Sequence, residues 1–199
     1  MPERFNFVAL LEAVDERAIR SDLVDRLRNC LSDWIGAPTE VFLLGDQTSQ
    51  VEPWAGATSL YARRLSDTEF LFTYFAARGV TQGQNVVLGV STSSQTAVYK
   101  LSFSALATLA EPDTALEVLC RIYQLMSAMN VHCIVAAGAE LEIDPAVQTV
   151  ENVVRSTREV DSLVSFVCCE SKDARDLRGF VSLGDRCGGA AFRREDRPA

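Results

Sequence analysis

The residues best suited to covalent chemistry are the single histidine, His132, and the cysteines. A cysteine nucleophile needs an imidazole within hydrogen-bonding reach to act as its base. His132 adjoins Cys133, but neighbours on a strand point to opposite faces, so the imidazole cannot serve that thiol. It could serve Cys187, which follows Arg186, a neighbour that favours a thiolate, and precedes two glycines. The alternative, which we prefer, is a histidine at the start of a buried strand and a thiol near the chain end.

Cys168 and Cys169 are adjacent in an apolar, strand-like run. Alternation sends one thiol inward and the other to the opposite face, where a wet surface would suit a redox or metal sensor. We favour two buried packing residues, because free cysteine behaves as a small hydrophobe. The N-terminus shows no basic segment followed by an apolar run, so we expect reduced thiols in a cytoplasmic protein.

Three carboxylates, Glu140, Glu142 and Asp144, alternate with Leu141 and Ile143. On a strand they would share one face, where carboxylates can do acid–base work or bind a divalent cation. We prefer a solvated acidic edge, which makes these three residues the candidate protein-binding residues and predicts no bound metal.

The motifs of common enzymes are missing from the sequence. Neither Gly-x-x-x-x-Gly-Lys-Ser/Thr nor Gly-x-Gly-x-x-Gly is present, and there is no Gly-x-Ser-x-Gly elbow. Cys-x-x-Cys spacing is absent as well, which argues against a zinc ribbon or a thioredoxin-like site. We therefore expect a chain that is not an enzyme and carries no cofactor.

The charge of the chain is unevenly distributed. The 199 residues carry a net charge of −8, and between residues 111 and 170 there are ten acidic residues and three arginines. Such a surface repels phosphate backbones, so nucleic acid is an unsuitable partner, whereas a basic protein is suitable. The simpler interpretation is a solvated face that maintains solubility. No apolar run approaches the length of a membrane span.

Apolar periodicity predicts a sequence of helices and hairpins in one domain over residues 1–190, followed by a flexible tail over 191–199. We expect helices at 5–14, 21–34, 66–78, 113–130 and 144–154, and strands at 41–44, 50–55, 86–90, 97–105, 131–135, 162–169 and 179–183. This order predicts an α+β fold, a mostly antiparallel sheet flanked by helices with GAF-, roadblock- or profilin-like layering.

The first two thirds of the chain resembles a GAF-type sensory domain. The helical pattern Leu23–Ile35, the break Gly36-Ala37 and the strand Val41–Asp46 follow the opening of that family, and Asn85–Phe103 with the helix Asp113–Asn130 follows its later part. The resemblance covers residues 5–130, and residues 131–190 form an extension. It implies a small-molecule pocket between sheet and helices, without identifying pocket residues.

Our leading hypothesis is a non-enzymatic, cytoplasmic regulatory or signalling module that acts by small-ligand or protein–protein contact. The first alternative is an acidic adaptor, such as a secretion chaperone or a toxin-neutralising immunity protein. The second is a thiol enzyme that uses Cys187 and His132. Aromatic residues at Trp34, Trp54, Tyr61 and 70–75 also predict a homodimer.

Overall fold

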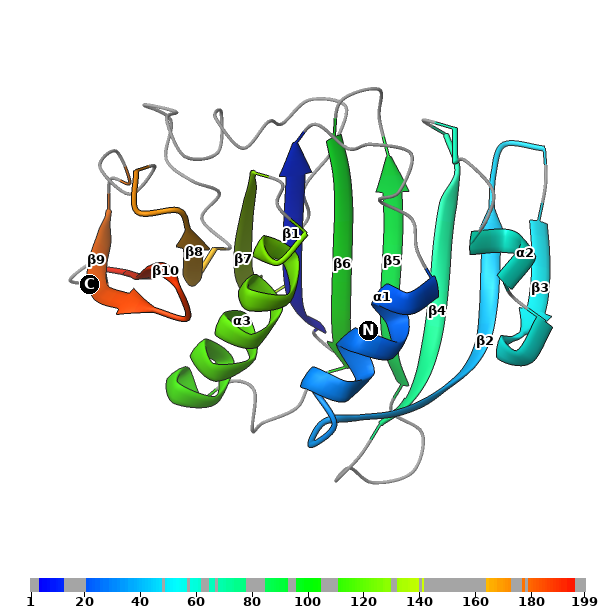
Figure 1. Ribbon diagram of the computed structural model, residues 1–199, viewed down its shortest axis with the longest axis horizontal. Helices are drawn as coiled ribbons and strands as arrows, with labels where there is room; N and C mark the ends of the chain where they lie inside the picture. The colour runs from blue at the N-terminus through cyan, green and yellow to red at the C-terminus, as the bar shows by residue number, and fades with distance from the viewer. Residues whose placement is uncertain are drawn as a thin grey trace.

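The chain folds around a single antiparallel sheet of ten strands (Figure 1). The computed structural model describes residues 4–12, 21–47, 49–56, 58–61, 65–66, 68–77, 85–92, 96–104, 111–129, 132–139, 141, 164–172, 177 and 179–195. The strands lie in the order β3-β2-β4-β5-β6-β1-β7-β8-β10-β9, and every neighbouring pair is antiparallel.

The elements have the following bounds. The strands are β1 (Arg4–Glu12), β2 (Ile35–Leu44), β3 (Ser49–Pro53), β4 (Phe70–Ala77), β5 (Asn85–Thr92), β6 (Thr96–Ser104), β7 (Cys133–Ala139), β8 (Phe166–Cys169), β9 (Phe180–Arg186) and β10 (Gly189–Arg194). The helices are α1 (Ser21–Cys30), α2 (Thr58–Tyr61), α3 (Pro112–Ser127) and the short 3-10 helix η1 (Trp54–Gly56).

The predicted α+β fold with GAF-like layering is wrong, because the sheet dominates the described residues. One cause is the first element, which was expected to be a helix over 5–14 and is the central strand β1. Residues Phe7 to Leu11 are at most 1% exposed, since β1 is buried on both faces. A strand buried on both sides has a continuous apolar run, which periodicity alone does not separate from a buried helix.

The second cause is β4, whose aromatic run was also expected to be helical. Ser66 and Glu69 have the spacing of a helix capping box and contact each other: the Ser66 backbone N–H donates to Glu69 Oε2 at 2.9 Å, and the Glu69 N–H donates to the Ser66 carbonyl at 3.0 Å. These bonds close a turn that leads into a strand. Pairing with β2 and β5 thus overrides a local helix signal.

Other expectations hold within small shifts. The hairpin β5–β6 and the long helix α3 lie where they were predicted. Helix α1 ends at Cys30, and Gly36 and Pro38 lie inside β2, whose register with β4 shifts on either side of Pro38. The predicted tail begins too early, because Ala191 and Phe192 are buried in β10. The helix predicted at 144–154 lies outside the described residues.

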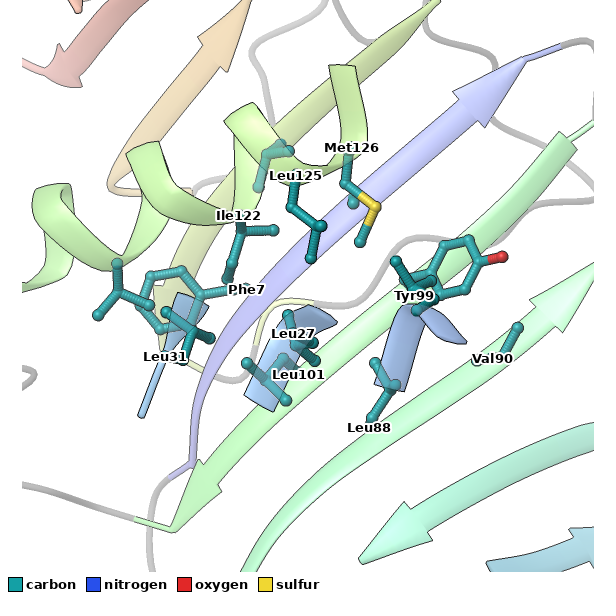
Figure 2. Packing of buried hydrophobic residues seen from close by; sticks show 14 of the residues in the cluster. Phe7, Leu27, Leu31, Leu88, Val90, Tyr99, Leu101, Ile122, Leu125 and Met126 are labelled. Carbon is teal, nitrogen blue, oxygen red and sulfur yellow. The ribbon is translucent and has the colours of Figure 1, made fainter. Parts of the chain in front are cut away.

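The two faces of the sheet are covered differently. Helices α1 and α3 lie on one face, which we call the inner face, and their apolar sides pack on β1, β5 and β6 (Figure 2). On the opposite, outer face a smaller group of the described residues, the outer cluster, covers the half formed by β1, β6, β7, β8 and β10. Its members are Val8, Leu10, Val98, Ile134, Ala136, Leu141, Val164, Val167, Cys169, Ala190 and Phe192.

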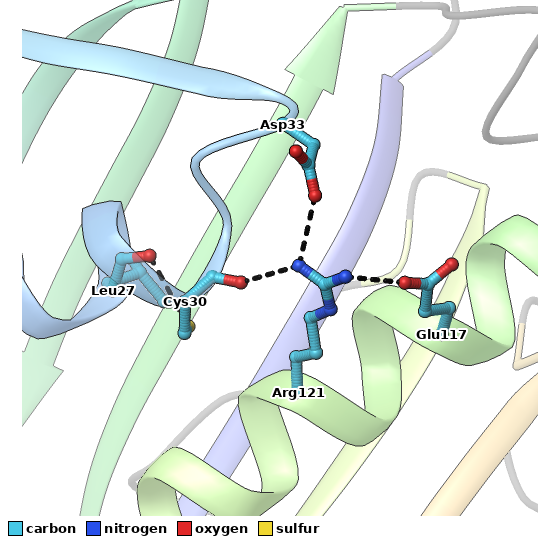
Figure 3. A network of polar contacts seen from close by, with 5 residues as sticks. All are labelled: Leu27, Cys30, Asp33, Glu117 and Arg121. Atoms are coloured by element: carbon cyan, nitrogen blue, oxygen red, sulfur yellow. Dashed lines mark hydrogen bonds and ion pairs between the residues drawn. The ribbon is translucent and has the colours of Figure 1, made fainter.

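Arg121 on α3 joins the two inner-face helices (Figure 3). Its Nη1 donates to the Cys30 carbonyl at the end of α1 at 2.9 Å and lies 3.2 Å from Asp33, while Nη2 lies 2.6 Å from Glu117. The guanidinium also lies over the Trp34 ring, 4.9 Å from its centroid. Both carboxylates are more than half exposed, so the helix-end carbonyl and the ring carry most of the benefit.

We expect Arg121→Met to lower the free energy of unfolding by about 1 kcal/mol, because it removes the bond to the helix-end carbonyl and the stacking on Trp34. Arg121→Lys should recover little of the loss, since an ammonium lacks the planar fork. Urea unfolding would measure both, with Arg26→Met on the exposed side of α1 as the matched control. Full stability of the lysine variant would contradict this assignment.

Candidate functional site

The half of the outer face formed by β2, β3, β4 and β5 is an open apolar surface. We call it the outer aromatic face, and its members are Phe42, Leu44, Val51, Phe70, Phe72, Tyr74 and Val87. Alternation along each strand places these side chains away from α1 and α3, and their sequence neighbours Val41, Leu43, Leu71 and Phe75 in the inner core. Leu44, Val51 and Phe70 are 42%, 57% and 42% exposed, respectively.

The rings on this face pack against one another. Phe72 stacks between Phe42 and Phe70, with ring centroids 6.4 Å and 6.2 Å away and interplanar angles of 27° and 12°. Gly89 on β5, which pairs with Phe72, leaves room for the ring, because a Cβ there would lie 3.3 Å from Phe72 Cε1. The rings are therefore held in place before any partner arrives, which reduces the entropy cost of binding.

One cross-strand row shows how the face changes along the sheet. Val51, Phe42, Phe72 and Gly89 are paired in register, and the row continues through Lys100 on β6 to Val8 in the outer cluster. Lys100 is half-buried and Val8 is fully buried. The same sheet face thus passes from the exposed Val51 and the half-buried rings of Phe42 and Phe72 to a covered core across a single lysine.

The structure describes a disulfide at Cys187 rather than a thiol. Cys187 is bonded to Cys120 on α3, with their Cα atoms 5.4 Å apart. His132 Nδ1 lies 3.0 Å from Glu12 Oε2, at the ends of the adjacent strands β7 and β1. In the predicted pair of His132 and Cys187, the imidazole thus contacts a carboxylate and the sulfur is bonded to Cys120. The expectation that all six cysteines are reduced is wrong for Cys120 and Cys187.

The disulfide fastens the β9–β10 hairpin to α3. Cys187 and Gly188 form its two-residue turn with φ of 58° and 79°, the conformation of a type I′ turn, in which asparagine and glycine are the usual residues. Next to it, the Gly189 backbone packs on the Tyr123 ring so closely that a Cβ would lie 2.5 Å from Tyr123 Cε1. A cysteine in the left-handed region costs roughly 1 kcal/mol, which the cross-link offsets.

The remaining cysteines carry thiols and are mostly buried. Cys133, Cys168 and Cys169 are at most 1% exposed, which confirms the interpretation of the 168–169 pair as packing residues. Burial raises the pKa of the Cys133 and Cys168 thiols to about 12, and that of the half-buried Cys30 to about 11. Such thiols remain protonated at neutral pH and are poor nucleophiles.

The remaining predicted site residues add no site. Glu140, Glu142 and Asp144 lie outside the described residues. Within the part of the chain that the structure describes, no group of three or more histidine, cysteine or acidic side chains is placed to hold a metal ion. In that same part, no helix is both long and apolar enough to cross a membrane.

No family model matches the sequence, and no curated protein matches it. The GAF resemblance remains a pattern-level prediction, and the layering it implied is overturned by the sheet.

The sequence analysis missed the outer aromatic face because it placed residues 70–75 on a helix. The signal was present: Phe70, Phe72 and Tyr74 alternate with Leu71, Thr73 and Phe75. Alternate residues of a strand point to opposite faces, so this run gives a strand that is largely apolar on both faces. A helix with one solvated side would instead carry polar residues on that side.

We expect Cys187→Ser to lower the free energy of unfolding by about 2–4 kcal/mol, because the cross-link closes a loop of 67 residues in the unfolded chain. Urea unfolding should give the same loss for wild type reduced with dithiothreitol. Cys30→Ser, which removes a free and half-buried thiol, is the control. If reduction leaves the midpoint unchanged, the disulfide does not hold the hairpin.

Alkaline pH should destabilise the fold. Burial raises the pKa of Tyr61 to about 12, as it does for Cys133 and Cys168, so between the ordinary values of 9.0 to 10.0 and about 12 these groups lose protons only on unfolding. Stability is therefore complete below about pH 9 and falls as the pH rises toward 12. Thermal unfolding across this range would measure the fall.

The double variant Cys133→Ala, Cys168→Ala provides the control for the alkaline experiment. It should reduce the decrease in stability that begins near pH 9, leaving the part linked to Cys30, and should keep the later, tyrosine-linked decrease. A midpoint that rises with pH over this range would contradict the burial of these groups.

Proposed function

We propose that this chain is a non-enzymatic protein-binding module and that the outer aromatic face is its contact surface. One observation carries the proposal: Leu44, Val51 and Phe70 are exposed next to one another. They surround the half-buried rings of Phe42 and Phe72, which stack on each other. Exposed apolar groups of this size on a soluble domain are typical of interaction sites, and aromatic residues supply most of the energy at interface centres.

The shape of the surface favours a protein over a small ligand. The space between the helices and the sheet, where the GAF resemblance implied a pocket, is packed with Leu27, Leu31, Ile122 and Met126 against the sheet (Figure 2). The outer aromatic face is an open side of a sheet, whereas small-molecule sites are concave and enclose their ligand.

The two sheet edges are poor alternatives for binding. Edge strand β3 has five residues and ends in Pro53, and edge strand β9 carries a register shift opposite Ala191 and Phe192, next to Gly184 with a φ of 84°. Short strands, proline and bulges are the features that prevent strand addition at an edge. A partner therefore has the face of the sheet to bind, rather than its edge.

An open apolar face supports the adaptor alternative over the ligand-sensing one, whether the adaptor is a chaperone or an immunity protein. The cytoplasmic location remains a prediction. The homodimer also remains a prediction. Fewer of the aromatic residues on which it was based are available for an interface, because Tyr61 is buried and Trp34 and Trp54 pack against the inner core. Phe70 and Phe72 lie on the outer aromatic face.

A photo-crosslinking amino acid placed at Phe70 or at Val51 should yield a discrete adduct with a protein when the chain is expressed in its own host. The same group at Val181 on β9, which is 44% exposed, should yield none. The adduct from the Val51 position should disappear when Phe72→Ser removes the central ring. The proposal would be contradicted if the Val181 position gave as much cross-linked product as Phe70 or Val51. It would also be contradicted if Phe72→Ser left the product from the Val51 position unchanged.

A further inference from the structure

The charges around the outer aromatic face identify the chemistry of its partner. Strands β2, β3, β4 and β5 carry two acidic residues, Glu40 and Glu52, and no lysine or arginine, and Asp46 lies in the turn between β2 and β3. Glu40 alternates with Val41 and lies on the outer face, whereas Glu52 pairs with Val41 and lies on the inner side of the sheet. Glu40 and Asp46 are exposed. The basic residue that the sheet register brings nearest is the half-buried Lys100, which makes contacts of its own.

We infer that the partner is a basic protein segment with an apolar stripe, which places leucine-like side chains on the outer aromatic face and lysine or arginine beside Glu40 and Asp46. This inference rests on the proposed function and adds the partner's charge to it. Complementary charge at the rim speeds encounter and excludes partners of the same sign, while the apolar centre supplies affinity.

A second copy of the chain is a worse occupant. The outer aromatic face spans four strands that lie about 4.8 Å apart, and its side chains extend over roughly 14 Å along the strands. Its apolar area is therefore about 300 Å². A stable interface needs about 800 Å² on each partner, so most of the contact would have to come from the rim. In a self-complex the exposed carboxylates of that rim, Glu40 and Asp46, would meet the same acidic rim of the second copy, whereas a basic partner gains from these charges.

The inference can be tested with three synthetic fluorescent peptides of equal length. The first contains leucine and lysine spaced to form an amphipathic helix, the second replaces each lysine with glutamate, and the third replaces each leucine with serine. Fluorescence anisotropy with the full chain should show binding of the first peptide only, and the binding should weaken as salt is raised, because the rim charges are exposed.

Two variants assign that binding to its parts. Phe70→Ser should weaken binding of the leucine–lysine peptide at least tenfold. Glu40→Gln and Asp46→Asn together should weaken that binding several-fold and reduce its salt dependence. Val181→Thr, on an exposed apolar residue of the far edge strand, is the matched control and should change nothing. Far-ultraviolet circular dichroism would confirm that each variant is folded.

The outcomes separate this inference from the proposed function. Equal binding of the leucine–glutamate peptide, or no effect of the Glu40→Gln and Asp46→Asn substitutions, would overturn the basic partner and leave the face as a binding surface. Self-association that Phe70→Ser abolishes, measured by light scattering, would overturn it in favour of a second copy. If Phe70→Ser leaves binding of the leucine–lysine peptide unchanged, both the proposed contact surface and the inference about its partner are overturned.

Discussion

The pairing of β1 with two strands at once is the constraint on which the whole structure depends. β1 lies between β6 and β7, with nine residues in register with one neighbour and seven with the other. It joins the strands that precede α3 in the chain to those that follow it (Figure 1). Because a one-residue slip would exchange the two faces, its register fixes which side chains enter the helix-covered core.

Given that register, the coverage of the sheet decides where the chain can make contacts. The inner face is filled by α1 and α3, which Arg121 joins, and the disulfide at Cys120 fastens the β9–β10 hairpin to α3. The outer face is buried around Val8 and open around Phe72. The open half is an apolar surface that the described fold does not bury, and it is the surface to which we assign the proposed binding function.

The parts of the fold that sequence alone predicted are those with a clear period. Helix α3 has an apolar stripe with a proline in its first turn, and β6 alternates apolar and polar residues. β1 and β4 were misassigned because their signals are ambiguous: one is apolar on both faces, and the other follows a capping box at Ser66 that closes only a turn. The disulfide between Cys120 and Cys187 joins residues 67 apart, so only the folded chain brings them together.

The central claim is that alternate residues of β4 face solvent on an uncovered side of the sheet. Hydroxyl-radical footprinting with mass spectrometry measures this directly, because exposed phenylalanine rings are oxidised faster than buried ones. The account predicts fast oxidation of Phe70 and slow oxidation of Phe75, Phe7 and Phe103, which are at most 1% exposed. Oxidation of Phe70 as slow as that of Phe75 in the isolated chain would show that the face is covered, and would contradict the account.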